Sequence, residues 1–177
     1  MIVDSSSLII FAKINKLKIL LDLYNNISIT QEIYKETVKE GEIIDSSDSK
    51  IIKEFIDSNK IKIIDLNKEY ENFFRNLDKR YSQLGCGESS AIALALQEKE
   101  RIIIMDERLG RKVCKLYDIT PKGTLRVLLE AFKRGIINEL KLKEIIKNIL
   151  ENKFRIGADV INEFWVLFEK IKRGRLR

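Results

Sequence analysis

The chain has 177 residues, of which 45% are hydrophobic and 34% are charged, and this balance is typical of a globular protein rather than a disordered one. It contains no histidine, which excludes Ser-His-Asp and Cys-His catalysis and any metal site with histidine ligands. The net charge of +6 is compatible with a polyanionic partner, but a solvated basic surface would give the same value.

The remaining composition indicates one domain in a reducing compartment. One proline and eight glycines leave little room for linkers, so we expect a single domain over residues 1–177. Cys86 and Cys114 are too few for a disulfide framework or a zinc site and are interpreted as reduced thiols. No apolar run approaches the roughly 20 residues of a membrane span, and the start lacks a basic n-region and a cleavage site. We therefore expect a cytoplasmic protein.

The spacing of apolar residues predicts strands that alternate with helices. Strands are predicted at 2–4, 27–29, 60–65, 102–105 and, before Pro121, at 119–120. Helices are predicted at 6–14, 17–24, 30–40, 49–58, 69–81, 89–98, 108–117, 124–134, 139–151 and 158–172, with a loop at 41–48, a turn at 85–88 and a basic tail at 170–177. This alternation implies a three-layer α/β/α sandwich around a short, mostly parallel sheet of four to five strands.

The run Ile102-Ile103-Ile104-Met105 is the most informative of the predicted strands. It has no helical period, and its β-branched residues favour a strand that is buried on both faces. Asp106 follows this strand, and Asp4 follows the predicted first strand in the same way. Because ligands of open α/β sheets bind beyond the carboxyl ends of the strands, we expect these two carboxylates to lie side by side at one sheet edge.

Several motifs along nearly the whole chain resemble the PIN-domain family, in the branch of predicted nucleic-acid-binding proteins similar to bacterial and archaeal toxin ribonucleases. These motifs are Ile2-Val3-Asp4-Ser5-Ser6, Ile33-Tyr34-Lys35-Glu36, Leu84-Gly85-Cys86-Gly87-Glu88-Ser89-Ser90-Ala91-Ile92, the strand followed by Asp106-Glu107, Lys122-Gly123-Thr124-Leu125 and Lys133-Arg134-Gly135. The resemblance implies a PIN-like fold in which acidic residues bind Mg²⁺ or Mn²⁺ and cleave RNA.

The acids that this resemblance implies are Asp4, Glu36, Glu88 and Asp106, with Glu107 as an outer member of the metal site. The sequence departs from the branch at Glu107, where a second aspartate is usual, and at Arg126, where a glycine is usual. All four principal acids are retained.

Physical chemistry supports these acids separately from the resemblance. With no histidine, a metal must be held by oxygen ligands, which favours Mg²⁺ or Mn²⁺. Asp4 and Asp106 are expected as inner ligands, Glu88 reaches the same point from a helix start, and Glu36 orients a water molecule. A water activated by the cation would attack phosphorus while the cation stabilises the charge on the phosphate oxygens.

Each of these acids also has a purely structural interpretation. Asp4 and Asp106 precede helical segments and would serve as N-caps. Glu88, in a first turn, would interact with the helix dipole. Glu36, like most helical glutamates, would be a solvated surface residue. The four acids together, in the family order, favour a functional site.

Nucleic-acid contacts are predicted for Thr124 and for the basic tail, through Lys172, Arg173, Arg175 and Arg177. The alternatives are a helix cap for Thr124 and a solvated end for the tail. Trp165 and Phe164 are interpreted as core or dimer packing rather than a base-stacking platform.

The function predicted from these features is a metal-dependent endoribonuclease, with RNA as substrate and an antitoxin protein or a second copy as candidate partners. One alternative is a nucleic-acid-binding or regulatory PIN-like module without turnover. A phosphatase with an aspartyl nucleophile is a further alternative. It usually has a second carboxylate two residues after the first, and Ser6 stands at that position.

Overall fold

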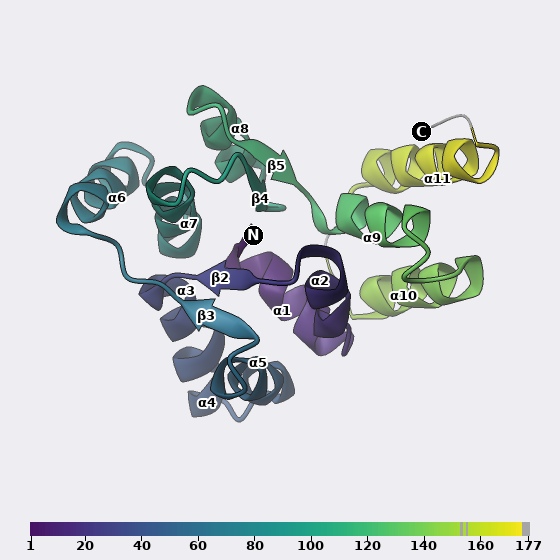
Figure 1. The fold of residues 1–177 in the computed structure, drawn as a ribbon, viewed down its shortest axis with the longest axis horizontal. Coiled ribbons are helices and arrows are strands. Elements are labelled where there is room, and N and C mark those ends of the chain that lie inside the picture. The colour runs from purple at the N-terminus through teal and green to yellow at the C-terminus, as the bar shows by residue number, and fades with distance from the viewer. Residues whose placement is uncertain (153, 155, 175–177) are drawn as a thin grey trace. The chain divides into compact units, whose positions relative to one another are not determined.

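The protein is described here from a computed structural model, which covers all residues except 153, 155 and 175–177. The chain forms two compact units, Met1–Gly123 (unit 1) and Thr124–Arg177 (unit 2). The strands belong to unit 1, and the described residues of unit 2 form helices and their connections (Figure 1). Within the part of the chain that the structure covers, no helix is both long and apolar enough to span a membrane.

Unit 1 contains a five-stranded parallel sheet with the strand order β3-β2-β1-β4-β5. The strands are β1 (Ile2–Val3), β2 (Ile27–Ile29), β3 (Ile61–Ile63), β4 (Ile102–Ile104) and β5 (Thr120–Lys122). With helices on both sides of this sheet, the predicted three-layer α/β/α sandwich is confirmed (Figure 1).

The strands form where β-branched residues run together, and they are buried because helices cover both faces. Val3, Ile29, Ile103 and Ile104 are completely buried. The last strand extends two residues beyond its predicted end and includes Pro121. Proline is tolerated there because β5 is an edge strand, in which a missing N–H need not break a ladder hydrogen bond.

Helices that pack on the strands and on one another complete unit 1. They are α1 (Ser5–Lys13), α2 (Leu17–Tyr24), α3 (Gln31–Tyr34), the π-helix η1 (Lys35–Lys39), α4 (Glu40–Ile43), α5 (Ser47–Asp57), α6 (Lys68–Arg80), α7 (Cys86–Gln97) and α8 (Arg108–Leu116). Helix α7 packs on β1 and β4, α5 packs on β3, and α8 packs on β5.

Three helical segments begin or end two or more residues away from their predicted boundaries, and one of them is α5, which begins at Ser47 rather than at 49. The helix expected at 30–40 continues through η1 to Ile43, so part of the expected loop at 41–48 is helical. Helix α7 begins at Cys86 rather than at 89, with Gly85 as its N-cap. The expected turn at 85–88 is therefore the first turn of a helix, and Gly85 has an ordinary φ of −65°.

Unit 2 consists of α9 (Thr124–Lys133), α10 (Glu139–Glu151) and α11 (Ala158–Lys172), within one residue of the predicted ranges. Aromatic rings join α9 to α11, since the Phe132 and Phe168 centroids lie 5.0 Å apart. Asn138 caps α10 by accepting a hydrogen bond from Lys141 N at 2.8 Å. The unit has its own core, which includes Leu142, Ile145, Ile149, Phe164 and Phe168.

Candidate functional site

Asp4 and Asp106 leave the sheet on adjacent parallel strands. Val3 at the end of β1 is paired with Ile104 at the end of β4, so the next residues emerge at the same edge. Asp4 N donates to Ile104 O at 3.0 Å, and Asp106 N lies 3.4 Å from Asp4 Oδ2. The prediction that the two residues follow neighbouring strands is thus confirmed by the strand order.

Ser7 joins the two carboxylates. Asp4 is the N-cap of α1, and its Oδ1 accepts a hydrogen bond from Ser7 N at 2.8 Å. The hydroxyl of Ser7 donates to Asp106 Oδ2 at 3.1 Å. Ser7 is completely buried, so its hydroxyl is confined to this position. Sequence reasoning missed this residue, although three consecutive serines at the start of an apolar helix were an available signal.

Asp4 is completely buried, and this location opposes its ionisation. Burial is the largest cause that raises the pKa of Asp4 from 3.8 to about 7, and the nearby carboxylates of Asp106 and Glu88 raise it further. Hydrogen bonds from Ser7 act in the opposite direction. A buried carboxyl that is destabilised by neighbouring negative charge is suited to a place where a cation binds.

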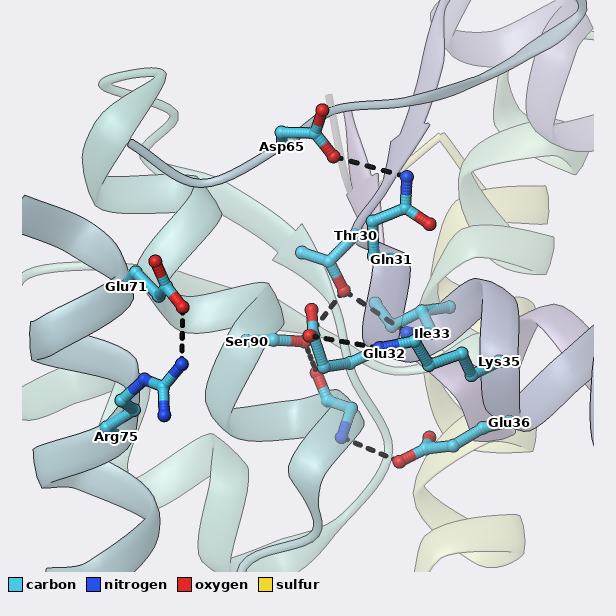
Figure 2. Close-up of polar contacts among 11 residues, drawn as sticks. Thr30, Gln31, Glu32, Ile33, Lys35, Glu36, Asp65, Glu71, Arg75 and Ser90 are labelled. Atoms are coloured by element: carbon cyan, nitrogen blue, oxygen red, sulfur yellow. Dashed lines mark hydrogen bonds and ion pairs between the residues drawn. The ribbon is translucent and has the colours of Figure 1, made fainter. Parts of the chain in front are cut away.

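Glu36 is half-buried in η1, so its interpretation as a solvated surface residue is wrong. Its Oε1 accepts a hydrogen bond from Gly87 N at 2.9 Å, the dashed line that ends on Glu36 in Figure 2. Its Oε2 accepts a short hydrogen bond from the Ser5 hydroxyl. Glu36 therefore ties η1 to the starts of α1 and α7. A π-helical turn at this point is also a feature often found at functional sites.

Two glycines allow the backbone to approach the Glu36 and Asp106 carboxylates closely. A Cβ atom at Gly87 would collide with Glu36 Oε2 and with the Ser5 hydroxyl. A Cβ atom at Gly123, just after β5, would lie 2.8 Å from Asp106 Oδ1. These glycines are needed for space rather than for a left-handed backbone conformation, and sequence reasoning had given Gly87 only a turn role.

Glu88 and Glu107 lie near the same edge but have different local roles. Glu88 is half-buried in the first turn of α7, and its pKa is raised by burial and by the Glu36 and Glu107 carboxylates. Glu107, not Asp106, is the N-cap of α8, and its Oε2 accepts a hydrogen bond from Gly110 N at 2.6 Å. The cap interpretation is thus confirmed for Asp4 and wrong for Asp106.

The carboxylate oxygens at this edge of the sheet are suitable ligands for a hard cation. Mg²⁺ is typically held by one or two carboxylates together with waters and substrate phosphates, and the Asp4–Asp106 pair supplies two. Among the residues that the structure describes, however, no three acidic or cysteine side chains are close enough together to hold a metal ion. The full set of predicted ligands, with Glu88 and Glu107, stays a prediction.

The predicted nucleic-acid contacts all belong to unit 2. Thr124 is the first residue of α9 and is buried, with 3% of its surface exposed. Lys172 Nζ lies 2.9 Å from Glu139 Oε2, and Arg173 Nη2 lies 3.8 Å from Glu169 Oε2. Arg175 and Arg177 lie outside the described residues. Contact of any of these residues with RNA stays a prediction.

Comparison with known protein families agrees with this architecture. A family model described as DUF3368: PIN domain matches residues 1–170. Among curated proteins, none matches the chain. The match spans nearly the whole chain, and the PIN domain is a nuclease-type fold. The parallel sheet, the acids at the ends of β1 and β4, and the family model agree: this chain belongs to the PIN-domain family.

Proposed function

We propose that the protein is a metal-dependent endoribonuclease that cleaves RNA phosphodiester bonds at the edge formed by β1 and β4. The observation that carries this proposal is the Asp4–Asp106 pair, tied together by the buried Ser7 in a chain of the PIN-domain family. The pair provides two oxygen ligands. The half-buried Glu36 and Glu88 support the proposal through their charges, because Glu88 raises the pKa of Asp4 and Glu36 raises the pKa of Glu88.

In this proposal Asp4 and Asp106 hold Mg²⁺ or Mn²⁺, and Glu88 and Glu107 contribute from the outside. When bound, the cation would lower the pKa of a water molecule and stabilise charge on the phosphate oxygens. The Ser7 hydroxyl, which donates to Asp106 Oδ2, would restrict the rotation of the Asp106 carboxylate.

Glu36 has a separate part in the proposed reaction. Its two oxygens accept hydrogen bonds from Gly87 and Ser5, which fix the carboxylate while leaving acceptor capacity for a water molecule. Glu36 would orient the attacking water and accept its proton as the oxygen bonds to phosphorus and the phosphorus–oxygen bond to the leaving ribose breaks.

The experiment that tests this function is cleavage of a mixed RNA pool by the purified protein. We expect fragments to accumulate with Mg²⁺ or Mn²⁺ and not with EDTA. Cleavage that continues in EDTA would exclude a metal-dependent reaction, and intact RNA under all conditions would exclude the nuclease.

A nucleic-acid-binding or regulatory module without turnover is the second candidate. The observation that favours it is that no three acids of the described residues gather into a ready-made metal site. RNA that is bound but remains intact in Mn²⁺ would support this candidate against the nuclease.

We also propose that the ribonuclease is the toxin of a toxin–antitoxin pair, since its motifs resemble the toxin-like branch of the family. Expression of the wild-type chain should then arrest growth, whereas expression of Asp106→Asn should not. A small, overlapping upstream gene whose product restores growth would identify the antitoxin. Normal growth with active wild-type enzyme in the cells would contradict the toxin role.

A further inference from the structure

The net positive charge of the protein comes from unit 2. Residues 124–177 contain 13 lysines and arginines and 7 acidic residues, whereas residues 1–123 contain 20 of each. The whole net charge of +6 therefore belongs to unit 2, while unit 1, with its acidic site, is balanced. A polyanion would be attracted to the helices of unit 2 first.

The surface of unit 2 carries an open groove along α10 and α11, with a volume of about 550 Å³. Its lining residues are Lys143, Ile146, Lys147, Leu150, Glu151 and Trp165. Trp165 is half-buried, and its ring makes edge-on contacts with Phe164 at 4.9 Å and Phe168 at 5.6 Å between centroids. Because both phenylalanines belong to the buried core, the indole is held in a fixed position.

We propose that this groove binds single-stranded RNA, with a base stacked on Trp165 and the flanking phosphates near Lys143 and Lys147. The proposal departs from the packing role expected for Trp165 from the sequence, because Trp165 lines the groove whereas Phe164 is buried. This inference rests on the proposed function for the choice of RNA as the ligand. A groove that combines an aromatic ring with cationic side chains is the arrangement that proteins use to bind single strands with little sequence preference. Ile146 and Leu150 add apolar surface against which a base can lie.

Both lysines can be released to a phosphate at small cost. Lys143 Nζ lies 2.7 Å from Glu139 Oε1, and Lys147 Nζ lies 3.6 Å from Glu151 Oε1. These are ion pairs between residues four apart on an exposed helix face, which contribute little to stability. A phosphate can therefore replace the glutamate partner without unfolding the helix.

The net positive charge of unit 2 favours RNA over a second copy of the chain as the occupant of the groove. A second copy would bring the same excess of positive charge in unit 2 to the contact, whereas RNA brings one negative charge per nucleotide. The apolar lining serves a base as well as it serves a side chain, because a base has an apolar face.

The sole tryptophan of the chain provides a direct reporter of stacking. The full-length protein is titrated in EDTA with an oligouridylate of about ten nucleotides, a length within the usual range for single-strand sites. We expect the oligonucleotide to quench the Trp165 fluorescence with the same midpoint that anisotropy of a labelled oligonucleotide gives. Binding without quenching would overturn the stacking role of Trp165.

Substitutions distinguish binding in the groove from a general attraction between RNA and the positive charge of unit 2. Trp165→Leu should weaken binding roughly tenfold. Lys143→Gln with Lys147→Gln should reduce the slope of log affinity against log salt by about 1.4, at about 0.7 per lost phosphate contact. The matched control is Lys133→Gln with Lys141→Gln, which removes the same charge from unit 2 outside the groove lining. An equal effect of both double substitutions would overturn the proposal, as would unchanged affinity in Trp165→Leu.

The titration tests RNA binding in the groove independently of the proposed ribonuclease activity. Because the titration is done in EDTA, quenching and the effect of the groove substitutions do not depend on cleavage. Groove-dependent binding together with no cleavage in Mn²⁺ would contradict the nuclease and leave the groove established. The Trp165 fluorescence could instead change with protein concentration and show no response to oligouridylate. That result would indicate a second copy of the chain in the groove and would overturn the proposal.

Discussion

Replacing Asp4 with asparagine is expected to stabilise the metal-free protein at neutral and alkaline pH. Asparagine caps a helix about as well as aspartate, so the hydrogen bond from Ser7 N, 2.8 Å long in the wild type, is preserved. What changes is the free-energy cost of a buried charge, because burial is the main cause that raises the pKa of Asp4 from 3.8 to about 7.

The size of this effect follows from the linkage between proton binding and folding. Between pH 3.8 and about 7 the folded chain keeps the Asp4 proton that the unfolded chain has released, so the contribution of Asp4 to stability falls as the pH rises. Each pH unit in this range costs about 1.4 kcal/mol, and ionised Asp4 therefore costs roughly 4 kcal/mol above pH 7. The advantage of Asp4→Asn should grow from near zero at about pH 4 to its full size above about pH 7.

The assay is urea denaturation of both proteins in EDTA at several pH values between about 4 and 8. Asp22→Asn, which removes an exposed carboxylate 2.9 Å from Lys18 Nζ, is the matched control and should lack this growing advantage. Added Mn²⁺ should stabilise the wild type more than Asp4→Asn. Parallel pH curves for wild type and Asp4→Asn would refute the buried-charge argument, and equal shifts with Mn²⁺ would refute a cation site at Asp4.

Three further predictions concern the surrounding residues. Glu88→Gln should lower Mn²⁺-dependent cleavage at least tenfold with unchanged circular dichroism, and Glu107→Gln should lower cleavage less. Equal losses of cleavage in the two variants would contradict the outer position of Glu107. Gly87→Ala should destabilise the protein by about 1–3 kcal/mol in urea denaturation, because the new Cβ meets Glu36 and Ser5; an unchanged midpoint would show that the close approach is not required. Lys172→Gln with Arg173→Gln should flatten the salt dependence of RNA binding if the tail contacts phosphates, and an unchanged slope would show that the tail is solvated.

The sequence was sufficient to predict the sheet and the position of its two aspartates. Runs such as Ile102–Ile104 have a single favourable environment, a strand buried on both faces, and a parallel sheet brings the ends of such strands to one edge. The boundaries of α9, α10 and α11 were also predictable, because each has apolar residues at helical spacing.

What the sequence could not supply were contacts between distant segments. The π-helical turn at Lys35–Lys39 carries no local signal, and the half-burial of Glu36 depends on Gly87, which lies 51 residues away. The role of Ser7 depends on Asp106, which lies 99 residues away. The two glycines at 85 and 87 suggested a turn. In the structure α7 begins at Cys86, and Gly87 in its first turn donates a hydrogen bond to Glu36, a contact that no local pattern indicates.

The central claim is that the Asp4–Asp106 pair supports metal-dependent cleavage of RNA. The most direct measurement is the single-turnover rate at which wild type and Asp106→Asn cleave an end-labelled RNA at increasing Mn²⁺ concentrations. We expect a wild-type rate that rises to a plateau with Mn²⁺ and is absent in EDTA, and a rate at least tenfold lower for Asp106→Asn, with unchanged circular dichroism. A variant that retains the wild-type rate and the wild-type Mn²⁺ dependence would contradict the claim.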